Sequence, residues 1–197
     1  MFSINKIKTS LLAFGFVISV QAQADWALNS ADSSLYYVTS KASAITEINR
    51  FTELSGAIDG SGNASLLIAL NSIDTAIPTR DQRMRDIVFE TAQYPQASVN
   101  VKIDAGALSA MSPGSSTRQT YDTRLSLHGM TETINAELSI SKLEDGSVLV
   151  QSVKPVVFSA AIFGLAGAVE QLREIAGLPS INPNVVVNFR LLYQQAR

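Results

Sequence analysis

The 197-residue sequence contains no cysteine and a single histidine, His128. The lack of cysteine excludes disulfides and leaves no acceptor for a lipid anchor attached to cysteine. It also excludes a Cys cluster, and one histidine cannot form a His pair, so we expect no zinc or iron site and no cofactor. A Ser-His-Asp hydrolase would have only His128 as its base. This residue shares a strand face with Arg124 and Ser126 beside an expected turn, so we expect its side chain to point outward. We therefore expect the protein not to be an enzyme.

Charge is scarce as well. Charged residues make up 16% of the chain, and the net charge is −2. A mildly acidic protein lacks the basic surface that nucleic acid requires, so we expect no nucleic-acid partner. After the N-terminal segment, no apolar stretch approaches the roughly 20 residues that a membrane-spanning helix needs.

Residues 1–24 have the pattern of a signal peptide. Lys6 and Lys8 precede the apolar run Leu11–Val20, and Ala22-Gln23-Ala24 fits a cleavage site. A buried N-terminal helix is the alternative. We expect cleavage after Ala24, a periplasmic protein, and one domain over residues 25–197 whose fold is held by burial alone.

Alternation of apolar and polar residues dominates this domain. It is clearest in three segments: residues 97–104, 133–140 and 185–194. Further strands are expected at 26–29, 34–41, 51–59, 64–73, 119–127 and 147–158. His128-Gly129-Met130 and Asp145-Gly146 predict chain reversals, the latter a hairpin turn of type I′. One-sided strands of this kind form antiparallel sheets with one dry face.

About eight such strands form either a sandwich or a barrel. Their length and hairpin connections favour an all-β fold, a lipocalin-like antiparallel up-and-down β-barrel with one or two short helices. A short helix with Arg80, Arg83 and Arg85 is expected at 80–89, an amphipathic helix at 165–176, and a loop at 109–117. The barrel can be filled by side chains or hollow, and alternation does not distinguish the two.

The apolar faces of the strands are expected to point into the barrel. Besides Ala97, Ala136 and Val185, the candidate lining residues are Val99, Val101, Ile103, Ile134, Leu138, Ile140, Val187, Phe189 and Leu191. Tyr36, Tyr37 and Trp26 are expected to fill the core or the barrel ends.

Arg80 is the candidate for contact with a polar head group. It follows the turn at Pro78, and an arginine forms bidentate bonds with phosphate and similar groups. The alternative is structural: the arginines pair with Asp81, Asp86 and Glu90, including an Asp81–Arg85 pair at helical spacing.

Several segments resemble the YceI-like family of periplasmic lipid- or polyisoprenoid-binding proteins. They are Phe51–Ile58, Ser72–Pro95, Leu127–Thr131, Phe163–Leu165 and the final strand with its Val-Val-Val-Asn-Phe sequence. The resemblance implies a lipocalin-like barrel whose cavity holds an isoprenoid chain, such as a polyprenyl lipid or a quinone. The expected function is therefore sequestration or transport of an amphiphilic isoprenoid or other long-chain lipid, with transient contact to a membrane or membrane protein. The alternative is a packed barrel that acts through its surface as a stress-associated or membrane-complex accessory protein.

Overall fold

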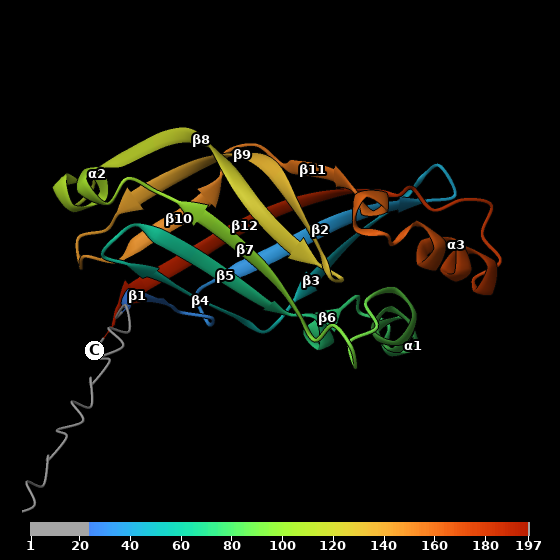
Figure 1. The fold of residues 1–197 in the computed structure, drawn as a ribbon. Helices are drawn as coiled ribbons and strands as arrows, with labels where there is room; N and C mark the ends of the chain where they lie inside the picture. Colours follow the sequence, from blue (N-terminus) through green and yellow to red (C-terminus); the bar gives the residue numbers. More distant parts are fainter. Residues whose placement is uncertain (1–23, 197) are drawn as a thin grey trace, which may run out of the picture.

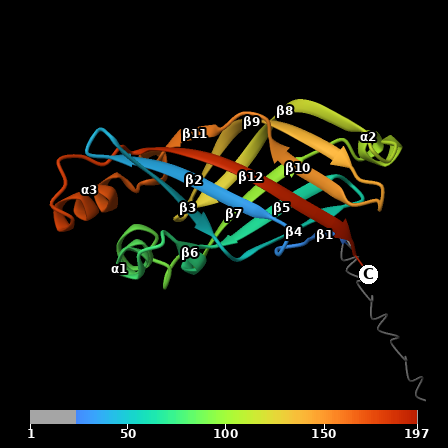
Figure 2. The ribbon, with the colours of Figure 1, turned by 180° about the vertical axis from the view of Figure 1, so that it is seen from behind.

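Antiparallel strands close into a ring in the computed structural model, which describes residues 24–196 (Figures 1 and 2). The strands follow one another around the ring in the order β1-β4-β5-β7-β8-β9-β10-β12, and β12 pairs with β1 to close it. The bounds are β1 Ala24–Leu28, β2 Ser34–Lys41, β3 Ile45–Phe51, β4 Leu54–Asp59, β5 Asn63–Ala69, β6 Ile73–Asp74, β7 Gln96–Lys102, β8 Ser116–Leu127, β9 Met130–Lys142, β10 Val148–Ser152, β11 Val156–Ser159 and β12 Asn184–Gln195.

The other four strands extend the ring toward one end of the barrel. β12 pairs along one edge with β10 and then β11, and along the other edge with β1 and then β2. β2 pairs with β3, and β3 pairs with β6. The pairs β1/β2, β3/β4, β5/β6 and β10/β11 thus continue one another across short breaks. Each break lies where the chain bends, for example at Pro155, which has no N–H to give to the sheet.

The predicted closed antiparallel barrel is therefore confirmed. One strand, β3, was missed. Its polar face points into the barrel and its apolar face points outward, the reverse of the other strands. Its inner face carries Glu47 and Asn49, whereas Ile48 points outward and is 71% exposed. A search for apolar inner faces passes over such a segment. The predicted strand at 51–59 therefore covers β4 and only the last residue of β3.

Two hairpins show how turn chemistry sets the register. Leu127 pairs with Met130, and His128 and Gly129 have φ angles of 52° and 76°, as a type I′ turn requires. At Asp145-Gly146 the predicted reversal is present, but only Gly146 has a positive φ, so the predicted turn type was wrong. The amide of Gly146 instead donates to the Leu143 carbonyl.

Three helices flank the barrel in the described part of the chain: α1 Pro78–Arg83, α2 Ala105–Ala110 and α3 Ala166–Ile175. α1 and α3 lie at one end and α2 at the other (Figure 1). α1 begins at Pro78 and continues into a π-helical turn at Met84–Val88, which contacts α3. α3 ends before Gly177, whose φ of 62° was expected from its position. α2 falls partly in the predicted loop, and the Asp104 side chain caps it by accepting from the Ala107 amide.

The proposed signal sequence lies almost wholly outside the described residues, which begin at Ala24. Between Ala24 and Ala196, no helix has the length and hydropathy needed to cross a membrane.

Candidate ligand-binding cavity

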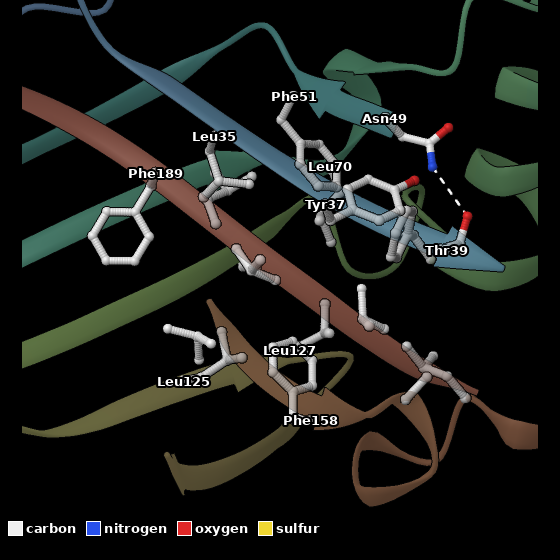
Figure 3. A pocket seen from close by; sticks show the side chains of 18 of the residues that line it. Leu35, Tyr37, Thr39, Asn49, Phe51, Leu70, Leu125, Leu127, Phe158 and Phe189 are labelled. Atoms are coloured by element: carbon white, nitrogen blue, oxygen red, sulfur yellow. Dashed lines mark hydrogen bonds between the residues drawn. The ribbon is translucent and has the colours of Figure 1, made fainter. Parts of the chain in front are cut away.

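The barrel is hollow. A cavity of about 480 Å³ runs through its interior, and its wall is formed mainly by apolar side chains of β2, β5, β7, β8, β9 and β12 (Figure 3). β3 adds Phe51 and the polar residues Glu47 and Asn49. This volume falls in the range of about 300–1,000 Å³ that is usual for small-molecule sites. An apolar site of this size has room for one extended, oily ligand.

The predicted lining residues all border this cavity. They are Val99, Val101, Ile103, Ile134, Leu138, Ile140, Val187, Phe189 and Leu191, together with Ala97, Ala136 and Val185. The strand register brings them together, with Val99 opposite Leu66 and Phe189 opposite Leu35. Their contact with a ligand remains a prediction.

Small side chains keep the interior open. Ala97 and Ala136 are each 3% exposed and line the cavity, and Ala64 joins them from β5. An alanine on an inner face does not reach across the barrel, so space remains between opposite walls. Val99, Ile134 and Phe189 point inward yet are only half-buried, because they border that space.

The end of the barrel near α2 is closed. Tyr193 is 3% exposed, and its hydroxyl donates to the Ser65 carbonyl at 3.0 Å, joining β12 to β5. Burial raises the pKa of the Tyr193 phenol, so it stays neutral. Leu108 of α2 is also buried in the core. Polar groups at this end are thus already paired.

The opposite end is the mouth. There the cavity is bordered by α1, by Val169 and Leu172 of α3, and by Lys41 and Ile181, which form a β-bridge. No residue of α3 is fully buried, although its apolar side packs against the core. The predicted amphipathic helix therefore covers the mouth of a hollow barrel.

Arg80 lies on the cavity wall at this mouth, but its terminal nitrogens are engaged. Nη1 lies 2.6 Å from Glu47 Oε2, and Nη2 donates to the Thr75 carbonyl at 2.6 Å. The other oxygen of Glu47 accepts from Lys41 at 2.9 Å. Burial acts to raise the pKa of Glu47, but the hydrogen bonds from Arg80 and Lys41 outweigh it and hold this pKa below its usual value of 4.5.

The acids expected to pair with the arginines have other partners. Asp81 accepts from the amide and hydroxyl of Thr75, and Asp86 accepts from Gln82. Glu90 bonds to His128. The predicted pairs with Asp81, Asp86 and Glu90 were therefore wrong. Arg80 pairs with Glu47 of β3, a strand that the sequence pattern did not show, and Arg85 donates to the Asn71 carbonyl and to Gln82 instead of pairing with Asp81. A head-group role for Arg80 remains a prediction.

Asn49 and Tyr37 also belong to the site. They face each other across β2 and β3, border the cavity and are buried at 4% and 7% exposure. The Asn49 amide donates to Thr39 Oγ1 at 3.3 Å (Figure 3). Tyr37 was expected only as a core residue, while its neighbour Tyr36 points outward and is 40% exposed. A polar inner face on residues 45–51 is the signal that could have revealed them.

His128 lies away from the cavity. Its Nε2 lies 2.7 Å from Glu90 Oε2, and its ring packs on Tyr94 at 4.3 Å between centroids. This is the place beside a turn that the sequence indicated. In residues 24–196, no group of three or more His, Asp or Glu side chains is arranged to hold a metal ion.

Together, the closed ring and its apolar cavity define a barrel of the ligand-binding, lipocalin-like class. The sequence matches the YceI-like domain over residues 26–192. The chain therefore belongs to the YceI-like family.

Solved structures agree with this assignment. A polyisoprenoid-binding domain from Saccharophagus degradans, implicated in plant cell wall breakdown, is similar at 36% identity and a TM-score of 0.86, over 88% of this chain and 100% of that one. BcnA of Burkholderia cenocepacia shares the fold at 16% identity and a TM-score of 0.65, over 84% and 98%. A Campylobacter jejuni YceI protein also shares the fold, at 16% sequence identity and a TM-score of 0.52, over 76% of this chain and 84% of that one. Among curated proteins, no significant match was found.

Proposed function

We propose that this protein binds an isoprenoid or similar long-chain lipid lengthwise in its barrel cavity and thereby sequesters or transports it. The observation that carries this proposal is the hollow apolar interior of about 480 Å³. Transfer of apolar surface from water to such a wall is favourable by about 25 cal/mol per Å². A barrel that acted only through its outer surface would need no such space.

The relatives support the class of ligand. The domain from Saccharophagus degradans is described as polyisoprenoid-binding, and its whole length aligns with this chain. An isoprenoid chain has no polar group along its length, so an apolar wall can select it only by shape and oiliness. The nine lining residues from Val99 to Leu191 would contact the chain, and Arg80 would lie near its polar end.

Lipid analysis of the purified protein tests this proposal. The protein would be purified without detergent from the compartment to which it is exported, extracted with organic solvent, and analysed by mass spectrometry. We expect one isoprenoid species at a near-equimolar ratio, and its depletion in the cavity-filling variant Ala136→Phe. Recovery of only bulk phospholipid, in equal amounts from both proteins, would contradict the proposal.

The site of action would be the periplasm, where a lipid carrier shields its cargo from water and meets a membrane or membrane protein only transiently. The support is the pattern of residues 1–24, with its basic start, apolar run and Ala22-Gln23-Ala24 site. N-terminal sequencing of the exported protein should begin at Asp25. Retention of Met1 would contradict this assignment.

A further inference from the structure

Two uncharged loops form the end of the molecule at the mouth of the barrel. One is the β2–β3 turn with the start of β3, residues 42–46, and the other is the end of α3 with the chain that follows it, residues 175–183. Neither loop contains Asp, Glu, Lys or Arg, although 16% of the chain is charged. Figure 1 shows the β2–β3 turn and α3 at the same end of the barrel. We call these two loops the apolar tip.

Backbone hydrogen bonds hold the two loops side by side. The Ala42 amide donates to the Ser180 carbonyl at 2.9 Å, and the Asn182 amide donates to the Ser40 carbonyl at 2.8 Å. The backbone groups that face each other between the loops are therefore paired. The apolar tip is one continuous surface whose shape is set by the backbone.

This surface exposes large apolar side chains. Ile45 is 48% exposed and Ile175 is 45% exposed, and Ala176 and Pro179 are exposed beside Ile175. Single exposed apolar residues are normal on a protein surface, but a contiguous group of them marks an interaction site. The apolar tip is such a group.

The apolar tip continues the wall of the cavity. Ala176, Leu178 and Ile181 belong to the tip and also border the cavity, whereas Ile45 and Ile175 do not border it and lie on the outside. Apolar surface therefore extends without a break from the interior to the exposed end. An oily chain that leaves the mouth along the tip stays in contact with apolar side chains.

The closed end of the barrel provides an internal comparison. Its turns carry charge: Asp59 lies at the β4–β5 turn, and Glu144 and Asp145 lie in the β9–β10 turn. The Lys102 ammonium donates to the Ser61 carbonyl at 2.7 Å at the same end. The end without an opening thus presents charged groups to water, and the apolar end is the one with the opening.

The composition of the apolar tip fits a lipid surface better than a protein partner. The centres of protein interfaces are rich in aromatic residues and arginine, and the tip contains neither. A hydrocarbon layer requires only apolar area and no complementary shape. The cations beside the tip are already paired, Lys41 with Glu47 and Arg173 with Glu170, so they add no net attraction for anionic lipid.

We propose that the apolar tip inserts shallowly into the surface of a phospholipid bilayer and holds the mouth of the barrel against it. A lipid then passes between the bilayer and the cavity along apolar surface, without crossing water. This rests on the proposed function, because a lipid in the cavity is what gives the mouth a reason to meet a bilayer. Insertion is driven by apolar area and does not depend on anionic lipid.

The absence of cysteine allows a direct test with a single fluorophore. Ser43→Cys in the β2–β3 turn would be labelled with nitrobenzoxadiazole, and Ser61→Cys at the closed end is the matched control. On mixing with phosphatidylcholine vesicles, the label at position 43 should shift to the blue and brighten, while the label at position 61 should not change. The response should be the same with added phosphatidylglycerol and at high salt, because no charge attraction contributes.

Two variants locate the contact. Ile45→Ser and Ile175→Ser each remove an exposed apolar side chain and should weaken vesicle binding about tenfold. Val157→Ser is the control, since Val157 is 58% exposed on β11, outside the tip, and it should leave vesicle binding unchanged. Thermal melting checks folding, and the label at position 43 decides the question if either tip variant does not fold.

A soluble probe separates the two proposals. Geranylgeraniol, measured by displacement of a fluorescent fatty acid, should bind equally well to the wild type and to both tip variants, because neither Ile45 nor Ile175 borders the cavity. If the wild type does not bind geranylgeraniol, the proposed function fails. If it binds geranylgeraniol but the label at position 43 does not respond to vesicles, lipid binding stands and docking on a bilayer is wrong.

Other occupants of the apolar tip would also overturn the docking. Vesicle binding that requires anionic lipid, or that is lost at high salt, would show attraction by charge instead of insertion. Self-association in sedimentation that Ile45→Ser abolishes, without any response to vesicles, would assign the tip to a second copy of the chain.

Discussion

Glu47 is the residue that joins the strands to the mouth helix. It bridges Lys41 of β2 and Arg80 of α1, and its side chain is 26% exposed. Arg80 itself was expected at the open end from the sequence, and it lies there. Its partner could not be predicted, because Glu47 and Arg80 are far apart in the chain and only the fold of β3 brings them together.

Glu47→Gln should lower the free energy of unfolding at pH 7 by about 1–2 kcal/mol, since it removes two charged hydrogen bonds at a partly exposed site. Because the folded-state pKa of Glu47 lies below 4.5, its contribution is complete above that value and is lost as the pH falls through the folded-state pKa. Urea denaturation of both proteins should therefore show a difference at neutral pH that shrinks on acidification.

Glu137→Gln is the control, because the Lys154 that pairs with Glu137 is largely exposed. It should change stability little at any pH. A Glu47→Gln effect that stays constant down to acid pH would show that the carboxylate charge is not its cause.

At the scale of elements, strands with one apolar face were readily predicted. In β7, β9 and β12 an apolar residue recurs at every second position and borders the cavity, although β12 also carries Val186 and Leu192 on its other face. β3 was missed because its inner face is polar, and α2 was missed because its six residues, five of them small, carry almost no helical pattern. The residues that depart from the pattern include Asn49, which is buried and borders the cavity.

Gly129 and Gly167 test the turn and the helix separately. Gly129 has a φ of 76°, and a Cβ there would lie 3.1 Å from the Tyr94 ring. Gly129→Ala should therefore destabilise the protein by about 1–2 kcal/mol. Gly167 lies in α3 with nothing near its Cβ position, so Gly167→Ala should stabilise by about 0.4–1 kcal/mol. Chemical denaturation that gives both changes the same sign would contradict these backbone assignments.

At the scale of the whole molecule, closure of the barrel was predictable but its hollowness was not. Alternation tells which way a side chain points, and hairpin signals tell which strands are neighbours. Whether opposite walls touch depends on the curvature of the ring and on where small residues such as Ala97 and Ala136 lie on its inner face. Those distances are properties of the closed structure.

Ala136→Phe should occupy part of the cavity and weaken isoprenoid binding by about tenfold or more, roughly 1.4 kcal/mol per factor of ten. In a hollow interior the added ring needs little repacking, so the stability loss should stay below the 1–3 kcal/mol usual for overpacked cores. Asn135→Phe places the same ring on the exposed face of the same strand and should leave binding unchanged. Equal affinities for both variants, measured by ligand titration, would count against the cavity as the binding site.

The most direct test of the central claim, that a lipid lies inside the barrel, is to measure intermolecular NOEs between a bound isoprenoid and the methyl groups of the protein. A lipid inside the barrel should give NOEs to the inner-face residues Val99, Val101, Ile134 and Val187. NOEs confined to the outer-face residues Ile48 and Val157, which are 71% and 58% exposed, would contradict it.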